Sequence, residues 1–419
     1  MTVTATSSHK PITGGSVTTR HRPESRRHGI GFSLIAFAFL TAMAFSTVPT
    51  PLYPLYMARD GFSTFMVTVV FATYAVGVVI SLLLAGHISD WTGRKKVLLP
   101  AIALELAAAL LFITTTSLPG LLVARFITGL GVGMITATAT AHLHELHSAH
   151  RPGASPHRFE LVSTAANIGG LGVGPLVAGI LAQWVAVPLR TPYIVFAVLL
   201  VLGLVAVALT PETVEEQFAK PTYRPQRISI DHGDRSRYLA AAAGAFASFA
   251  VFGLFTSVAP GFVAGTLHQP SRALAGLIVF AAFGGAAVAQ SVTARLSTDT
   301  KRRLGLSSQA AGVVILVVGM YTANLAAFLI GGVIAGIGAG VLFKAALGTV
   351  AAAAVPAKRG EALAGLFLIA YLGLTLPAVG IGVATLSASA TTVMTWFASL
   401  LLALLATVAV LARRRPAAH

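Results

Sequence analysis

The sequence of 419 residues contains no cysteine and few acidic residues. Without cysteine the chain can form no disulfide, no thiolate metal site and no thiol nucleophile. Only 13 residues are Asp or Glu, against 29 Lys or Arg, and charged residues make up 10% of the chain. A soluble domain carries about 25% charged residues. This shortage argues against a soluble fold, because a surface in water needs polar side chains.

Two further absences narrow the function. No Gly-rich Lys loop of the Walker type occurs, which argues against ATP drive within this chain. The apolar runs contain no cluster of acids and histidines and no activated nucleophile, so we expect no enzyme activity, no cofactor and no metal site. The net charge of +16 lies in short clusters between apolar runs and not in one patch, so we also expect no nucleic-acid partner.

Long apolar runs dominate what is present. Apolar residues make up 56% of the chain and the mean hydropathy is +0.82. A helix needs about 20 apolar residues to cross a bilayer. The runs that meet this length predict twelve spans, near residues 31–56, 64–86, 97–116, 119–141, 159–185, 190–210, 238–265, 273–293, 304–322, 325–350, 361–385 and 389–412. We therefore expect an all-α integral membrane protein in contact with the lipid bilayer.

Basic residues alternate along the chain in step with these spans. If the N-terminus is cytosolic, 24 of the 29 Lys and Arg residues fall on the cytosolic side, three fall outside, and Arg125 and Lys344 lie within spans. This bias predicts that both termini are cytoplasmic in a bacterial-type cell (inner) membrane. The predicted organisation is a disordered tail at 1–29, a six-helix bundle at 30–210, a cytosolic linker at 211–237, a second six-helix bundle at 238–412 and a tail at 413–419.

The two predicted bundles show weak parallel sequence similarity. Phe45-Ser-Thr-Val resembles Phe255-Thr-Ser-Val, and Gly129-Leu-Gly-Val-Gly resembles Gly336-Ile-Gly-Ala-Gly at nearly the same offset. Arg94 aligns with Arg302 in this register. Two such repeats are typical of transporters whose substrate site lies at the repeat interface near the bilayer midplane.

The loop after the second span, Gly86–Lys96, reads GHISDWTGRKK. It resembles the cytoplasmic signature of the major facilitator superfamily, in which a Gly, an Asp and a later Gly-Arg-Arg/Lys recur at this spacing. Trp91 stands where the superfamily usually has Arg. The resemblance implies two pseudo-symmetric six-helix bundles and a conformational latch that holds the outward-open state.

We expect each latch residue to have a physical role. A glycine at the end of the second span allows close helix packing, and a second glycine permits the tight turn. The two cations anchor at the anionic leaflet, and the carboxylate faces a helix N-terminus, near Arg359–Glu361. The residues assigned to the latch are Gly86, Asp90, Gly93, Arg94 and Lys95.

Two glycine-rich motifs occur in the fourth and fifth spans. The fourth carries Arg-x-x-x-Gly-x-Gly, and the fifth resembles the Gly-x-x-x-Gly-Pro-x-x-x-Gly motif of the superfamily's efflux (antiporter) branches. Generic packing by small residues is the alternative reading. The residues assigned to helix packing and bending are Gly129, Gly131, Gly170, Gly174, Pro175 and Gly179.

Proton coupling would require a titratable group inside the membrane. Glu105 is the only carboxylate near the middle of a predicted span, and burial would favour its protonated form. In proton-coupled members of the superfamily, the Arg that corresponds to Arg125 is associated with proton transfer. A structural role for Glu105, and snorkelling or carbonyl capping by Arg125, remain alternatives.

Further candidates are Tyr53, Tyr56 and Lys344, assigned to substrate binding or gating. The tyrosines lie in a segment with three prolines, Pro49, Pro51 and Pro54, that should bend or unwind the end of the first span. Snorkelling to the cytosolic face is the alternative for Lys344. Five histidines, His142, His144, His147, His150 and His157, lie in or beside the cytosolic loop between the fourth and fifth spans and are interpreted as part of a solvated loop rather than as a metal site or pH sensor.

These observations predict a secondary transporter that works by alternating access. The expected function is proton-coupled efflux of small, partly hydrophobic molecules, with protons as the coupling ion and a monomer as the working unit. The alternative is an importer of a sugar, an organic acid or another metabolite.

Overall fold

The computed structural model describes residues 22–214, 223–228, 235–355 and 358–412. In these ranges, twelve helices or helix runs are long and apolar enough to cross a membrane, and no strand is present. The elements of the first half are α1 (Arg22–Thr47), η1 (Thr50–Leu52), α2 (Tyr53–Asp60), α3 (Thr64–Ala85), α4 (Ser89–Thr92), α5 (Arg94–Thr114), α6 (Leu118–His150), α7 (His157–Thr164), η2 (Ala165–Gly169), α8 (Gly170–Trp184) and α9 (Thr191–Leu209). Those of the second half are α10 (Arg235–Gly253), η3 (Leu254–Val258), α11 (Ala259–Gly265), α12 (Arg272–Val292), α13 (Thr298–Tyr321), α14 (Leu325–Ala353), α15 (Arg359–Ala384) and α16 (Ala390–Leu411).

Short polar turns separate the helices, and their serines begin the next helix. Ser63, Ser117, Ser271, Ser297 and Ser389 each accept a hydrogen bond from the backbone N–H three residues later. This N-cap satisfies a donor that would otherwise be left unpaired in or near lipid. The predicted span count and boundaries are thus confirmed to within a few residues, apart from the differences below.

Three boundaries differ from the sequence prediction. The predicted disordered tail is too long, because α1 begins at Arg22; residues 1–21 lie outside the described residues. The second bundle begins at Arg235, and most of the predicted linker, like the tail at 413–419, lies outside the described residues. The fourth span continues to His150, beyond its predicted end at residue 141.

The prolines that follow α1 have the expected effect. Regular α-helix ends at Thr47, a 3₁₀ turn follows at Thr50–Leu52, and α2 resumes at Tyr53. Proline removes backbone donors and clashes with the preceding turn, so the α-helical hydrogen bonds cannot run through this segment.

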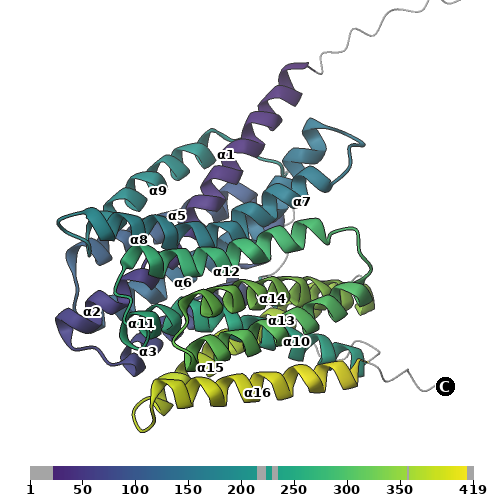
Figure 1. Ribbon diagram of the computed structural model, residues 1–419. Coiled ribbons are helices and arrows are strands. Elements are labelled where there is room, and N and C mark those ends of the chain that lie inside the picture. Colours follow the sequence, from purple (N-terminus) through teal and green to yellow (C-terminus); the bar gives the residue numbers. More distant parts are fainter. Residues whose placement is uncertain (1–21, 215–222, 229–234, 356–357, 413–419) are drawn as a thin grey trace, which may run out of the picture.

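The two halves pair their helices in the same way. In the first half, α6 contacts α1, α3 and α5, and α1 contacts α8 and α9. In the second, α14 contacts α10, α12 and α13, and α10 contacts α15 and α16 (Figure 1). The main contacts between halves are also related by the repeat, because α8 meets α12 and α15 meets α3. The predicted duplication of a six-helix bundle is therefore present in the packing.

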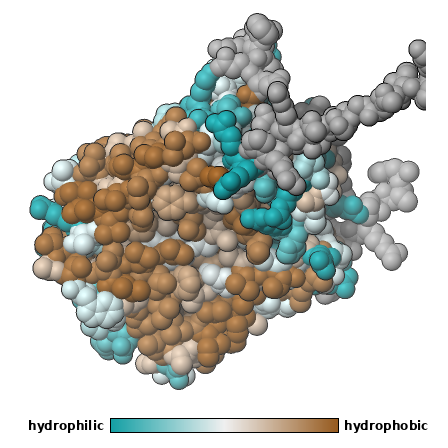
Figure 2. All heavy atoms as spheres, turned by 90° about the horizontal axis from the view of Figure 1, so that it is seen from above, coloured by the Kyte–Doolittle hydropathy of each residue, from teal (hydrophilic) through white to brown (hydrophobic). Residues whose placement is uncertain are grey.

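The outer face of the molecule is apolar along the helices. Figure 2 shows brown, hydrophobic residues covering most of this face and teal, hydrophilic residues gathered mainly towards one end. Large apolar side chains such as Leu209, Val292 and Leu400 are more than two-thirds exposed. This surface suits a lipid environment, where apolar faces need no polar cover.

Candidate functional site

The bundle has two chemically different ends. We call the end that carries Arg94, Arg151, Lys301 and Arg359 the basic end, and the end that carries Asp60 and Arg190 the opposite end. In Figure 1 the basic end lies to the right and the opposite end to the left.

The halves are packed closely towards the opposite end. An added Cβ at Gly179 of α8 would meet the Arg272 carbonyl oxygen and Gly276 of α12. On the other side of the interface, an added Cβ at Gly382 of α15 would meet Thr68 of α3. Small residues permit this backbone approach across the interface.

Towards the basic end the halves enclose a cavity of about 620 Å³. It extends from Thr47 and Arg125, deep in the bundle, to His144 and Glu145 near the end of α6 and Leu363 near the start of α15. The cavity is therefore lined continuously from the interior to the basic end. Its volume falls in the range of about 300–1,000 Å³ usual for small-molecule sites.

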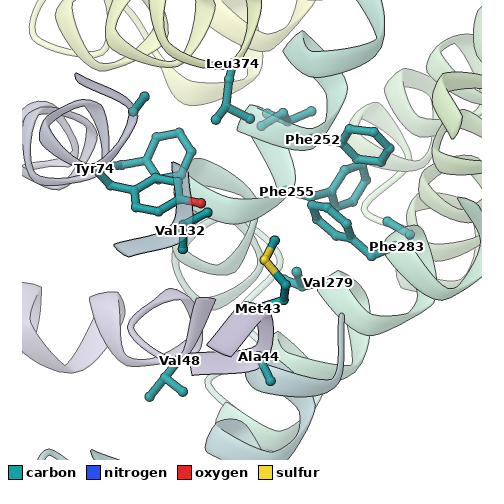
Figure 3. Close-up of a cluster of buried hydrophobic side chains, with 14 of the residues drawn as sticks. Met43, Ala44, Val48, Tyr74, Val132, Phe252, Phe255, Val279, Phe283 and Leu374 are labelled. Atoms are coloured by element: carbon teal, nitrogen blue, oxygen red, sulfur yellow. The ribbon is translucent and has the colours of Figure 1, made fainter. Parts of the chain in front are cut away.

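The second half supplies an aromatic wall. Phe252 of α10 stacks on Phe283 of α12 with ring centroids 4.6 Å apart. Figure 3 labels both residues within a cluster of buried hydrophobic side chains. Phe249 makes edge contacts with Phe343 and Tyr371 at 4.9 and 5.6 Å. All five line the cavity. Sequence reasoning missed this wall, because its five rings come from four helices, α10, α12, α14 and α15, and form no motif.

The first half supplies the polar wall, and Arg125 is its only cation among the described cavity residues. The side chain is 1% exposed, so it does not snorkel outward. Its Nη1 donates to the Ser46 carbonyl oxygen at 2.6 Å, and its guanidinium lies 4.6 Å from the ring centre of Tyr74. Of the two alternatives for Arg125, outward snorkelling and carbonyl capping, the structure thus supports carbonyl capping. The Arg125 side chain also lines the cavity.

Two π-helical segments border this cavity. η2 contributes Asn167 and η3 contributes Thr256 to its lining. A π turn leaves wider backbone spacing than an α turn and often occurs at functional sites. Both segments interrupt otherwise regular spans at the level of the cavity.

Glu105 lies behind this wall, between α5 and α6. It is fully buried, and neither carboxylate oxygen has a hydrogen-bond partner among the described residues. An added Cβ at Gly131 would lie 2.7 Å from Oε1, so glycine at that position makes room for the carboxyl group. Glu105 does not ion-pair with Arg125. An isolated buried carboxyl avoids a large desolvation cost only when it is protonated.

The glycines predicted to permit packing do so. An added Cβ at Gly129 would meet the Tyr74 carbonyl of α3, and added Cβ atoms at Gly170 and Gly174 would meet α1 at Met43 and Ala44. Pro175 lies inside α8, and its carbonyl is approached by Gly276 of α12. The glycine motif of the fifth span thus packs α8 against both halves.

The latch loop forms an ion network within the first half. Arg94 is buried and donates to Glu145 of α6 at 2.7 Å, to Ser89 at 2.7 Å and to Asp90. The expectation that Arg94 anchors at the anionic leaflet is wrong, because its charge is neutralised inside the protein. Glu145 was missed; an acid at the end of a span in so acid-poor a chain was the available signal.

Of the other latch residues, Gly93 has the expected geometry, whereas Gly86 and Asp90 do not make the contacts expected of them. Gly93 has φ +109°, as its turn requires. Gly86 does not pack against another helix: an added Cβ would meet only Leu82, one turn earlier. Asp90 is largely exposed and pairs with Arg94, so in this conformation it does not face the N-terminus of α15.

Glu212, which follows α9, caps the start of α5. Its carboxylate accepts from the backbone N–H groups of Arg94 at 2.9 Å and Lys95 at 3.0 Å. Burial alone would raise the pKa of Glu212, but these backbone donors hold that pKa below its usual value. Lys95 in turn donates to the Ala208 carbonyl oxygen at the end of α9.

The histidine interpretation is wrong for most of the cluster. His142, His144, His147 and His150 lie on α6, not in a loop, and the first and third are buried. His142 contacts the Pro211 carbonyl oxygen at 3.1 Å, so the ring packs the end of α9 against α6. The helix continues past the end of the predicted span, where this surface is covered by neighbouring elements.

The three remaining candidates lie away from the cavity. Tyr56 is buried within the first half, with its hydroxyl 3.4 Å from that of Tyr193, and Tyr53 is buried beside it. Lys344 donates to the Gln290 carbonyl oxygen near the end of α12 at 3.0 Å. None of the three lines the cavity, so a direct substrate contact is not supported for them in this conformation.

Comparisons with known proteins agree with this geometry. The Major Facilitator Superfamily model matches residues 35–235. The chain belongs to the major facilitator superfamily. Relatives and solved structures that resemble it are named as transporters.

Similar sequences cover only part of the chain. The multidrug resistance protein MdtL of Klebsiella pneumoniae (strain 342) is 28% identical over 183 residues, which are 42% of this chain and 43% of that protein. The uncharacterized MFS-type transporter Rv1877 of Mycobacterium tuberculosis (strain ATCC 25618 / H37Rv) is 27% identical over 160 residues, 38% of this chain and 23% of that protein. The matches thus span less than half the length of these relatives.

Solved structures match nearly the whole fold. A POT family transporter in complex with a thioalcohol-conjugated peptide has a TM-score of 0.73 at 12% identity, covering 92% of this chain and 96% of that one. The human organic anion transporter MFSD10 has a TM-score of 0.68 at 16% identity, covering 92% and 100%. These likenesses establish the twelve-helix superfamily fold.

Proposed function

We propose that this transporter exports small, partly hydrophobic molecules in exchange for protons. The observation that carries the proposal is the central cavity, in which an aromatic wall from one half faces Arg125 from the other. Aromatic rings offer contact area to apolar, flat compounds without demanding fixed hydrogen bonds. One buried cation and a few hydroxyl groups supply orientation.

The basic end faces the cytosol in this proposal, following the distribution of Lys and Arg. The conformation with a cavity at the basic end is then the inward-open state, and the packed glycines at the opposite end close the outer side. In the outward-open state, Asp90 and Arg94 engage the start of α15 as the latch. In the present conformation Arg94 pairs with Asp90 and Glu145 of its own half.

Glu105 carries the proton, and Arg125 couples it to the cavity. A buried carboxyl without partners favours its neutral form, so protonation depends on how closely a positive charge approaches. Movement of Arg125 between the Ser46 carbonyl and a bound molecule would change the field at Glu105. The similarity to MdtL, named for multidrug resistance, agrees with efflux of varied compounds.

Transport direction and coupling can be tested together. The purified protein is first screened by thermal stabilisation against aromatic drugs, sugars and organic acids, and the best ligand is then followed in proteoliposomes. We expect an aromatic compound to be moved against its gradient when the opposite compartment is acidic. Proton-driven uptake of a sugar or organic acid in the same direction as the proton would refute export and support the importer alternative.

A further inference from the structure

Several hydroxyl groups that line the central cavity have a fixed hydrogen-bonding role. Each donates its proton to a carbonyl oxygen of its own span, three or four residues earlier, over 2.7–3.1 Å. A hydroxyl group has a single proton, so these oxygens can only accept a hydrogen bond from a molecule in the cavity. The residues are Ser46, Thr47, Thr136, Thr140 and Thr256.

Arg125 has the opposite role, because a guanidinium group can only donate. Its Nη1 donates to the Ser46 carbonyl oxygen at 2.6 Å, which is its only hydrogen bond within the part of the chain that the structure describes. Further N–H groups of Arg125 therefore remain for an acceptor on a bound molecule. Other lining side chains, such as Asn167 and Tyr371, can donate or accept, so they fit either kind of ligand.

These fixed donors and acceptors lie beside the aromatic wall. Thr136 contacts the Met43 sulfur at 4.0 Å, and Figure 3 shows Met43 between Tyr74 on one side and the Phe252 and Phe283 rings on the other. Thr140 follows Thr136 by one helical turn, so their side chains are neighbours on one face of α6. A flat molecule packed on the wall can therefore turn its edge towards hydroxyl oxygens of the first half.

We propose that the cavity selects uncharged, flat aromatic molecules that carry a carbonyl group and several N–H or O–H groups. The rings pack on the aromatic wall, the carbonyl accepts from Arg125, and the N–H or O–H groups donate to the threonine oxygens. This inference rests on the proposed function, because it takes the central cavity as the substrate site.

Charged molecules fit this lining less well. An anion would find a partner in Arg125 but would also meet hydroxyl oxygens that have no proton to offer it. A cation would meet Arg125, and Glu145 at the mouth of the cavity is already paired with Arg94. A buried polar group that is left without a partner lowers affinity, so both kinds of ligand bind more weakly than an uncharged donor.

The test compares equilibrium dissociation constants of matched probes for the purified protein. Diaminoanthraquinone has the rings, the carbonyls and N–H donors, whereas anthraquinone lacks the donors and diaminoanthracene lacks the carbonyls. Anthraquinone that carries a sulfonate or a quaternary ammonium group adds a charge of either sign. We expect diaminoanthraquinone to bind about tenfold more tightly than each of the others, which corresponds to one or two neutral hydrogen bonds.

A variant tests the acceptor role of the threonines. Thr136→Val removes one acceptor oxygen and nearly keeps the shape of the side chain, so the preference for diaminoanthraquinone over anthraquinone should fall about threefold. Thr375→Val is the matched control, because its hydroxyl group donates to the Tyr371 carbonyl oxygen at 2.8 Å in the same way but does not line the cavity. It should keep the full preference. An equal change in both variants, or no change in Thr136→Val, would overturn the acceptor role.

The probes separate this inference from the proposed export, because a dissociation constant depends on neither transport direction nor a proton gradient. Tighter binding of anthraquinone or of either charged derivative would overturn the ligand class. A protein that prefers diaminoanthraquinone but does not exchange it for protons in proteoliposomes would support the ligand class and refute the proposed export.

Discussion

The two halves of this transporter keep one packing scheme but carry different chemistry. Arg125 stands four residues before the glycine motif of α6, and at the same place before the motif of α14 the chain has Gly332. There the Phe255 ring packs closely, since an added Cβ would lie 2.7 Å from it. Likewise, Glu105 aligns with Val313. At these aligned positions the first half carries ionisable groups and the second half does not, although rings of both halves line the cavity.

Such a division suits a binding site at the interface. Burying an unpaired charge is costly, so one polar site placed in a single half limits that cost. The other half can then offer rings that tolerate varied ligands. Substitutions in one half or the other test this contrast between the halves.

Removal of the buried cation should abolish transport. Arg125→Leu leaves the Ser46 carbonyl oxygen without its donor and removes the arginine from the cavity, at a cost of about 1–3 kcal/mol in local interactions. Lys344→Gln is the matched control, because it removes the other intramembrane cation, which lies off the cavity. Uptake assays in proteoliposomes should give background rates for the first and more than half the wild-type rate for the second. Equal losses would mean that any intramembrane cation suffices.

Opening the packed interface should shift the conformational equilibrium. Gly276→Leu places a side chain against the Pro175 carbonyl, and overpacking of this kind costs about 1–3 kcal/mol. The chain lacks cysteine, so Thr47→Cys provides a single label site in the cavity. We expect maleimide added at the opposite end to label Thr47→Cys roughly tenfold faster with Gly276→Leu than without it.

The control for this experiment is Gly380→Leu. An added Cβ at Gly380 meets no atom within 4 Å, so its labelling rate should stay that of the parent. If maleimide labels Thr47→Cys at the same rate in the Gly276→Leu and Gly380→Leu backgrounds, the glycine contacts do not close the opposite end.

An arginine–carboxylate ion pair should contribute more to the free energy of unfolding in the first half than in the second. Glu145→Gln leaves buried Arg94 partly unpaired and should lower the free energy of unfolding by about 1–3 kcal/mol. Arg302→Gln breaks a half-exposed pair with Asp299 and should cost less than about 1 kcal/mol in phosphatidylcholine. Chemical unfolding of both variants measures the difference, and a larger loss for Arg302→Gln would reverse the contrast.

Glu212 should give a smaller, pH-dependent effect. Its pKa is lowered in the folded protein, so its contribution to stability is present at neutral pH and is lost as the pH falls below about 4.5. Glu212→Gln should lower stability at pH 7 by about 1 kcal/mol, the size of a helix-cap contribution, and reduce the pH dependence below that range. Unfolding midpoints measured across this range provide the check; an unchanged slope in the variant would argue against the cap.

The fold was largely predictable from the sequence, because lipid forces each span to satisfy its own backbone and to be apolar over a fixed length. Charge alternation and the paired glycine motifs then predicted two bundles, which the helix pairings confirm. Errors arose where helices continue beyond the apolar run, as α6 does to His150. That extension is stabilised by contacts with α9 and Pro211, which no local pattern reveals.

The site was predictable only in part. Intramembrane charges identified Arg125 and Glu105, because such residues are costly unless they have a function. The partner of Arg94 was not predictable, since Glu145 lies 51 residues away on another helix. The aromatic wall was not predictable either, because rings such as Phe252 and Phe283 come together only through tertiary packing.

The most direct test of the account is proton coupling in Glu105→Gln. Gln has nearly the shape of protonated Glu but cannot release a proton, so the cavity should still bind and exchange substrate across the membrane without a gradient. We expect this counterflow to persist while a pH gradient no longer drives uphill transport. Undiminished uphill transport driven by the pH gradient in Glu105→Gln would contradict the account and place the proton site elsewhere.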